Sequence, residues 1–185
     1  MTRAASGGRL CLAALTIAAC AFAQAAGEGN AFMPKGGRSL VLDLLGPSYD
    51  AAQLREITQA RRSEPQWREF IATRKSTLTQ REQATLAAYL AVNMPIAGDA
   101  LKRDKPALDL PQDGRELAGE RCESCHSLFA GYLTQERDMQ GWRNIFISPY
   151  HSELKISPQE LEEFARYSVL NMPMKIEDVP PDMRF

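Results

Sequence analysis

The sequence contains few cysteines and histidines and no large excess of either charge. Only two histidines occur among 185 residues, so a catalytic set of serine, histidine and aspartate is not expected. Basic residues number 22 and acidic residues 23, for a formal net charge of −1, which offers no electrostatic basis for binding nucleic acid or a strongly anionic membrane. No glycine-rich loop of the kind that holds phosphate groups is present. These absences make the few cysteines and histidines the residues most informative about chemistry.

The amino terminus has the pattern of a secretory signal peptide. An uncharged run over residues 10–23 follows two arginines, and small residues suited to cleavage come after it. The run is too short to span a bilayer comfortably, so residues 1–25 predict export to the periplasm. Cys20 ends a string, IAAC, that resembles a lipobox. It is expected either to be one more apolar residue of the leader or to become a lipidated terminus that anchors the protein to a membrane.

Outside this leader the cysteines are Cys122 and Cys125, and His126 follows directly. The string CESCH has the spacing of a c-type haem attachment motif. Two cysteines three residues apart face one side of a helical turn, so both thiols can add to the vinyl groups of one porphyrin while the histidine binds the iron as proximal ligand. A zinc site would need a fourth ligand, and His151 comes without a second cysteine pair. A thioredoxin-like motif would need a βαβ context, whereas the surrounding pattern is helical. We therefore predict one covalently bound haem c.

An internal repeat surrounds this motif. Trp67 and Trp142 each begin a Trp-Arg pair, and a capping box, a tyrosine and an Asn-Met-Pro string follow in the same order. The tyrosine comes seven residues after the glutamate of the capping box in both copies. The repeated strings are the capping boxes at 79–82 and 157–160, the tyrosines at 89 and 167, and Asn-Met-Pro at 93–95 and 171–173. This common register predicts an all-α fold made of two related helical modules.

The expected organisation of the chain has five parts. They are a signal peptide (1–25), a first module (28–97), a linker rich in Pro, Asp and Lys (98–111), a second module (112–174) and a proline-containing tail (175–185) that could wrap a domain. The first module contains neither cysteine nor histidine. We therefore expect it to be a haem-free copy that covers the haem domain or docks a partner. The alternative is an unrelated helical domain with a coincidental match.

The second module resembles the small helical cytochromes c of class I. A haem motif, then a helix that opens with Trp-Arg, then a capped helix that ends in Tyr-x-x-x-Asn is similar to the haem modules of quinohaemoprotein amine dehydrogenase large subunits. Related modules occur in cytochrome subunits of other periplasmic dehydrogenases. The resemblance implies that Cys122, Cys125 and His126 hold the haem and that Trp142 packs near the ring. It also implies a methionine about two helical turns after the tryptophan as the distal ligand.

The sequence departs from this pattern at the distal ligand, because a proline stands seven residues after Trp142. The candidates are His151, Met139, Met172 and Met174. Met172 has a counterpart, Met94, in the haem-free copy, so it is more economically a packing residue at a helix end. His151 falls in a segment that is three residues longer in the haem-bearing copy, which is expected of a displaced ligand. An exposed loop histidine is the plain alternative, Met139 is the second candidate ligand, and an open site is also possible.

These features predict electron transfer outside the cytoplasm, by a free shuttle or by the cytochrome subunit of a dehydrogenase or oxidase. Two axial ligands would support that function, because outer-sphere transfer needs no open coordination position. The alternative is a peroxidase or gas sensor, which needs a vacant or displaceable sixth position. We expect an electron-transfer protein rather than an enzyme, with a redox protein as partner and no nucleic acid. Contact with a membrane is expected only if Cys20 is lipidated.

Overall fold

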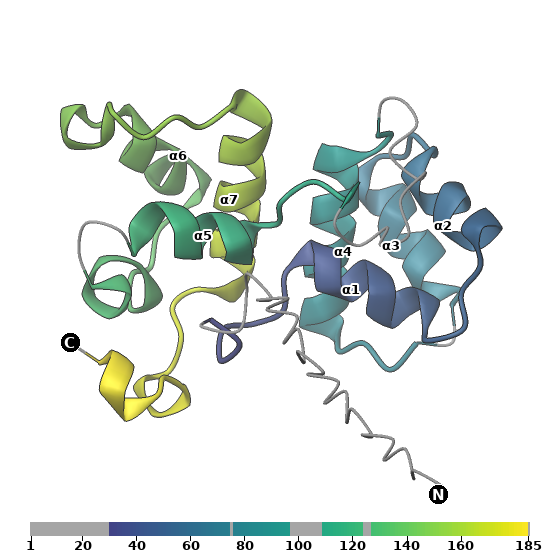
Figure 1. The fold of residues 1–185 in the computed structure, drawn as a ribbon, viewed down its shortest axis with the longest axis horizontal. Helices are drawn as coiled ribbons and strands as arrows, with labels where there is room; N and C mark the ends of the chain where they lie inside the picture. Colours follow the sequence, from purple (N-terminus) through teal and green to yellow (C-terminus); the bar gives the residue numbers. More distant parts are fainter. Residues whose placement is uncertain (1–29, 75, 97–108, 124–126, 185) are drawn as a thin grey trace, which may run out of the picture.

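The computed structural model describes residues 30–74, 76–96, 109–123 and 127–184. Within these ranges the secondary structure is helical and contains no strand (Figure 1), which confirms the predicted all-α class. No helix in the described ranges has the length and apolarity needed to cross a membrane. The expected signal peptide with Cys20 lies outside the described residues, as do most of the expected linker, Cys125 and His126.

The helices form two bundles that Figure 1 shows on either side of the molecule. The first bundle consists of α1 (Gly37–Leu45), α2 (Ala51–Thr58), α3 (Glu64–Ala72) and α4 (Gln80–Asn93). The second consists of α5 (Gly114–Cys122), the π-helical turn η3 (Phe129–Leu133), α6 (Met139–Ile147), the 3₁₀ turn η4 (Pro149–His151) and α7 (Pro158–Asn171). Two 3₁₀ turns, η5 (Ile176–Asp178) and η6 (Pro181–Met183), complete the tail.

The last helix of each bundle begins at a capping box, as predicted. The Thr79 hydroxyl accepts a hydrogen bond from the Glu82 backbone, and the Glu82 carboxylate accepts one from the Thr79 backbone. Ser157 and Glu160 make the same reciprocal pair at the start of α7. Each box satisfies two backbone N–H groups that would otherwise lack a partner at the helix start. Both α4 and α7 therefore begin at the same register of the repeat.

Each bundle has its own apolar core, centred on a fully buried tryptophan. In the second core the Trp142 ring meets the Tyr132 ring at a centroid distance of 5.2 Å and the Phe164 ring at 5.9 Å. Phe146 adds an edge contact to Phe164 at 5.0 Å. The first core packs aliphatic residues around Trp67. Burial of these large rings favours docking of α6 on α7.

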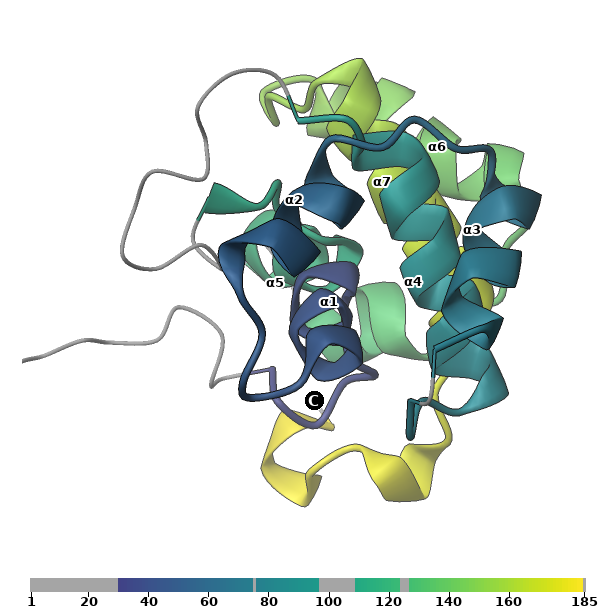
Figure 2. The ribbon, with the colours of Figure 1, turned by 90° about the vertical axis from the view of Figure 1, so that its right-hand side faces the viewer.

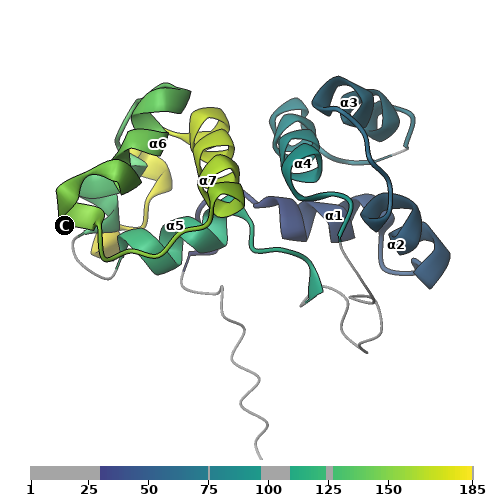
Figure 3. The ribbon, with the colours of Figure 1, turned by 90° about the horizontal axis from the view of Figure 1, so that it is seen from above.

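The two bundles meet where α4 packs against α7 (Figures 1 and 3). Asn93 donates a hydrogen bond from Nδ2 to Glu163 Oε2 at 3.1 Å, and Asn171 donates from Nδ2 to Thr85 Oγ1 at 3.1 Å. Each asparagine occupies the last position of its helix, and its partner sits eight residues before the last position of the opposite helix. The contact is therefore pseudo-symmetric: equivalent residues of the two copies make equivalent hydrogen bonds across it.

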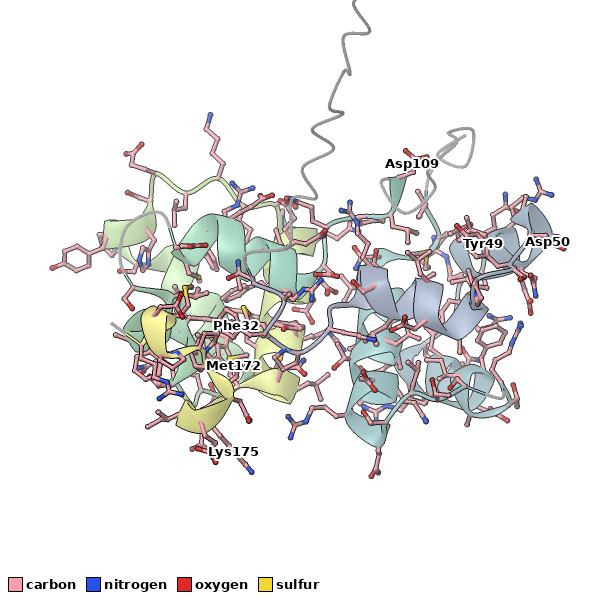
Figure 4. All side chains as sticks on the ribbon, turned by 60° about the horizontal axis from the view of Figure 1, so that its bottom comes forward. Phe32, Tyr49, Asp50, Asp109, Met172 and Lys175 are labelled. Atoms are coloured by element: carbon pink, nitrogen blue, oxygen red, sulfur yellow. The ribbon has the colours of Figure 1, made fainter. Side chains whose placement is uncertain are left out.

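The chain segments before α1 and before α5 are exchanged between the bundles. Tyr167 of α7 donates to the Pro34 carbonyl at 2.6 Å, and Tyr89 of α4 donates to the Pro111 carbonyl at 2.8 Å. Met33 accordingly packs in the second core, whereas Leu110 packs in the first. Figure 4 shows Phe32, from the same segment as Met33, near Met172 of the second bundle. The expected range 28–97 thus leaves out the segment with Leu110 that packs in the first core, and it includes the segment with Met33 that packs in the second.

The helices α1 and α5 cross close to the two tyrosines because each begins with glycine. A Cβ on Gly37 would lie 2.0 Å from Tyr89 Cγ, and a Cβ on Gly114 would lie 2.1 Å from Tyr167 Cβ. No side chain larger than hydrogen fits at either place without moving a helix. This close approach recurs at equivalent positions of both copies, as expected for a duplicated module.

The tail packs back on the second bundle after the Asn-Met-Pro string. Val179 is buried in the second core and Met183 packs against its edge. Figure 2 shows this last segment, in yellow, along the lower side of the molecule. The tail therefore belongs to the second bundle and helps to close its core.

Candidate functional site

Cys122 ends α5 at the wall of a cavity. Its side chain is buried, with 9 % of its surface exposed. The helix is held there by its apolar side, on which Leu117 and Ala118 are fully buried in the second core. Asp113 caps the other end by accepting hydrogen bonds from the backbone of Arg115 and Glu116. The end of α5 is thus fixed by a cap at its start and by packing along its length.

The cavity beside Cys122 measures about 220 Å³ and is walled mainly by apolar and aromatic side chains. Tyr132 of η3, Phe146 of α6 and Leu154 of the following loop form these walls. Tyr132 is held in place by a hydrogen bond of 2.8 Å between its hydroxyl and that of Ser168. His151 contributes the imidazole of this cavity. The fold therefore brings Cys122 and His151 to one cavity, although 28 residues separate them in the sequence.

The His151 ring is oriented by the backbone of α6. Its Nδ1 lies 2.7 Å from the Ile145 carbonyl oxygen. Because a carbonyl oxygen can only accept, Nδ1 carries the hydrogen of this bond. In the neutral ring the lone pair then belongs to Nε2, which is the form in which imidazole binds metals. The ring is therefore fixed in a tautomer suited to coordination through Nε2.

The loop that carries His151 is itself ordered by backbone hydrogen bonds. The His151 N–H donates to the Ser148 carbonyl at 2.9 Å, and the Leu154 N–H donates to the His151 carbonyl at 2.9 Å. Leu154 also packs against the second core. These contacts hold the backbone of His151 to the end of α6, so the position of the imidazole is determined from both sides of the loop.

The methionines considered as alternative ligands lie elsewhere. Of the described residues that line the cavity, none is a methionine. Met139 is the first residue of α6, at the opposite end of that helix from the loop of His151. Met172 and Met94 follow the last residues of α7 and α4, where both are buried. The Met174 backbone N–H donates to the Leu133 carbonyl at 2.8 Å, which ties that segment to η3.

Two arginines add positive charge to the cavity wall. Arg121 Nη2 lies 4.0 Å from Glu160, and its Nε is buried without a hydrogen-bond partner among the described residues. The Arg137 guanidinium lies 5.8 Å from the centroid of the Trp142 ring. Guanidinium groups pair with carboxylates in a planar, two-pronged geometry. The cavity can therefore accept an apolar group that carries carboxylates at one edge.

Burial changes the acidity of the Cys122 thiol. Removal from water raises its pKa to about 12, so the thiolate is scarce at neutral pH. Redox exchange and metal binding both need the thiolate, and burial disfavours them here. A thioether, in contrast, requires no ionised sulfur. Among the described residues, no cluster of three or more His, Cys, Asp or Glu side chains could hold a metal ion.

At the equivalent place in the first bundle, two arginine side chains lie over an aromatic ring. Phe70 follows Trp67 by three residues, as Ile145 follows Trp142. The guanidinium groups of Arg62 and Arg74 stack over the Phe70 ring at 4.3 and 4.5 Å from its centroid. A leucine, the last residue of α1, stands where Cys122 stands at the end of α5. The first bundle therefore has the helices of the second without its thiol.

One feature is shared by the two tryptophans and so does not distinguish the second bundle from the first. The Nε1 atoms of Trp67 and Trp142 are both buried without a hydrogen-bond partner among the described residues. An arginine precedes each tryptophan by five residues and lies over its ring, Arg62 at 4.7 Å and Arg137 at 5.8 Å from the centroid. These are properties of the repeated module.

The sequence predicts Cys122 and His151 as site residues, but it does not predict the side chains that line the cavity between them. Tyr132 lies in a π-helical turn, for which hydrophobic periodicity gives no signal. Arg137 could have been found, since the repeat places an arginine five residues before both tryptophans. Cys125 and His126 lie outside the described residues. Comparison with known proteins adds no further candidate, because no family model, curated protein or solved structure matches the chain.

Proposed function

We propose that this protein transfers electrons in the periplasm through one haem c. The haem would be attached through thioether bonds to Cys122 and Cys125, with His126 as the proximal iron ligand. One observation carries the proposal: the first cysteine of the motif lies at a largely apolar cavity whose wall also contains an imidazole. The export signal and the spacing of the motif are independent support from the sequence.

The kinds of residue that line the cavity suit a haem. Tyr132, Phe146 and Leu154 offer apolar surface of the kind that packs against a porphyrin. Arg121 and Arg137 would pair with its propionates, which gives the buried Arg121 Nε a partner. The high pKa of the Cys122 thiol is compatible with a thioether and disfavours competing thiolate chemistry. When bound, the haem supplies an iron that alternates between two oxidation states.

The polypeptide contributes exclusion of water and fixed geometry. An apolar wall lowers the local dielectric and limits solvent access, both of which tune a metal centre. Tyr132 packs against the Trp142 and Phe164 rings, and Phe146 packs against Phe164, so the wall is expected to move little when the charge on the iron changes. A site that moves little has a low reorganisation energy for electron transfer, which suits an electron carrier.

The haem-free bundle is proposed to support the haem bundle and to present a surface to a redox partner protein. Its α4 covers one side of α7, and its Arg38 pairs with Glu116 of α5 at 2.8 Å. Another link joins Arg166 of α7 to Glu64 of α3 at 2.6 Å. These contacts brace the two helices that position the site.

Export of the full chain in a bacterial host that matures c-type cytochromes tests the proposal. Haem should remain with the wild-type polypeptide on a denaturing gel, and Cys122→Ala with Cys125→Ala should abolish this covalent signal. Ser124→Ala serves as the matched control, because it changes a residue between the two cysteines and leaves both thiols and the histidine, so the haem should be retained. A wild type that runs free of haem would refute the proposal. Covalent haem that reacts rapidly with peroxide would instead favour the alternative of a haem enzyme or sensor.

A further inference from the structure

We propose that His151 is the sixth ligand of the haem iron and binds it through Nε2. This inference rests on the proposed attachment of haem at Cys122 and its neighbours, and it specifies how the other face of the iron is closed. Its first basis is position: among the described residues that line the cavity beside Cys122, the potential iron ligands are His151, the cysteine itself and Tyr132, and the Tyr132 hydroxyl is already hydrogen-bonded to Ser168.

The second basis is the orientation of the ring. The hydrogen bond of 2.7 Å from Nδ1 to the Ile145 carbonyl is the kind of outer contact that metal-binding histidines make with their second nitrogen. It fixes the tautomer and limits rotation of the ring. The Ile145 carbonyl is therefore a positioning group for the proposed ligand.

The third basis is the difference between the two copies of the module. Residues 148–157 connect α6 to α7, whereas residues 73–79 connect α3 to α4, so the haem-bearing copy is three residues longer at this point. The extra length accommodates η4, which ends at His151. In the shorter loop Arg74 lies over the Phe70 ring instead. The imidazole thus occurs in the copy that carries the haem motif, in a segment that the haem-free copy lacks.

The methionines compete poorly for this role. Met139 begins α6, while His151 follows the end of that helix, and Met139 is absent from the cavity wall. Met172 repeats the position of Met94 in a bundle without a haem motif. A residue that both copies retain is explained by packing at the helix end.

Two imidazoles give the site a specific chemistry. With an imidazole on each side, the iron would have no position open to small ligands. The two imidazoles also give a lower reduction potential than a histidine–methionine pair would give in the same site. The proposed carrier should therefore accept and pass electrons without binding gases.

The test compares four purified, exported proteins: wild type, His151→Ala, His151→Gly and Tyr150→Ala. Covalent haem per polypeptide is measured first, by mass and by the absorption of the pyridine complex. Absorption and electron paramagnetic resonance spectra of the ferric forms, and carbon monoxide binding by the ferrous forms, are then recorded. Tyr150 is the matched control, since it is the neighbouring residue of the same turn and is 94 % exposed. Circular dichroism verifies that each variant retains the helical fold.

Wild type and Tyr150→Ala are expected to be low-spin and inert to carbon monoxide. His151→Ala and His151→Gly should be high-spin, and the fraction of haem that binds carbon monoxide should rise from near zero to near one. Added imidazole should restore a low-spin spectrum to His151→Gly. A haem-loaded wild type that is already high-spin would overturn the inference, as would a His151→Ala protein that stays low-spin; in both cases the proposed haem attachment would stand. Absence of covalent haem from all four proteins would overturn both proposals.

Discussion

Replacement of Glu163 by glutamine is expected to remove a large part of the pH dependence of stability. This carboxyl is 2 % exposed at the contact between α4 and α7. Burial, followed by the charge of nearby Asp113, raises the pKa of Glu163 to about 8. Hydrogen bonds of 3.1 Å from the Gly114 N–H and from Asn93 Nδ2, together with Arg166, oppose this rise without cancelling it. Glu163 is therefore mostly protonated in the folded protein at neutral pH.

The sign of the effect follows from proton linkage. The folded state holds a proton on Glu163 up to about pH 8, whereas an unfolded glutamate with a pKa of 4.5 has already released it. The stabilisation is complete below pH 4.5 and is lost as the pH rises through 8. At about 1.4 kcal/mol for each pH unit, the free energy of unfolding should fall by an amount on the order of 5 kcal/mol over this window. Glutamine stays neutral and should cost about 1 kcal/mol at pH 5 through an imperfect hydrogen bond.

Urea unfolding of the mature protein between pH 5 and pH 8.5, followed by far-ultraviolet circular dichroism, measures this difference. Glu163→Gln should be slightly less stable than wild type at pH 5 and clearly more stable at pH 8.5. The control is Glu162→Gln on the same helix. Burial tends to raise the pKa of Glu162, but Arg143 and Arg166 donate hydrogen bonds to its carboxylate and lower it overall. The control should therefore lose stability by a nearly constant amount between pH 6 and 8.5. Parallel curves for wild type and Glu163→Gln would refute the reasoning.

Three further predictions concern the close contacts around α5. Tyr167→Phe leaves the Pro34 carbonyl without its hydrogen bond and should lower the free energy of unfolding by about 1–2 kcal/mol in urea titrations; an unchanged midpoint would exclude this contact. On an exposed helix, Gly114→Ala would add about 1 kcal/mol of stability through helix propensity. Here the new Cβ would lie 2.1 Å from Tyr167 Cβ, so we expect the free energy of unfolding to fall by about 2 kcal/mol or more in the same assay. A more stable variant would contradict this packing. In a haem-free chain with Cys125→Ser, burial raises the pKa of the Cys122 thiol to about 12, so its alkylation should be at least about 30-fold slower in buffer than in urea; equal rates would contradict its burial.

Much of the architecture could be predicted from residues that act locally. Capping boxes depend on contacts within four residues, so the starts of α4 and α7 were correctly placed by the strings at 79–82 and 157–160. The repeated tryptophan and Asn-Met-Pro strings predicted two related bundles because they recur in one register. The all-α class followed from the same pattern.

The contacts between the bundles could not be predicted in this way. Met33 and Leu110 are both apolar, precede equivalent helices and would suit either core, so no local pattern shows that they are exchanged. Glu163 stands among other glutamates on α7, and its burial depends on Asn93 of the other bundle. Such long-range pairing follows from the docking of α4 on α7, which hydrophobic periodicity does not specify.

The candidate site likewise has a part that local sequence patterns predict and a part that depends on long-range contacts. The spacing of Cys122 and Cys125 is the sequence signal for the proposed haem, because in that proposal two thiols must reach one porphyrin. The longer loop between α6 and α7 makes His151 a candidate from the sequence. Its position beside Cys122 depends on how η3 and α6 pack around the cavity. The hydrogen bond to the Ile145 carbonyl had no sequence signal, since every residue carries such a group.

The most direct test of the proposed haem is the mass of the tryptic peptide that spans residues 122–137 of the exported protein. Cleavage after Arg121 and Arg137 isolates the entire motif on this peptide. We predict that it carries the added mass of one intact haem, survives reduction by thiols unchanged and absorbs as a haem during chromatography. A peptide with the mass of the polypeptide alone, or with a reducible disulfide between its two cysteines, would contradict covalent haem and with it the proposed electron-transfer function.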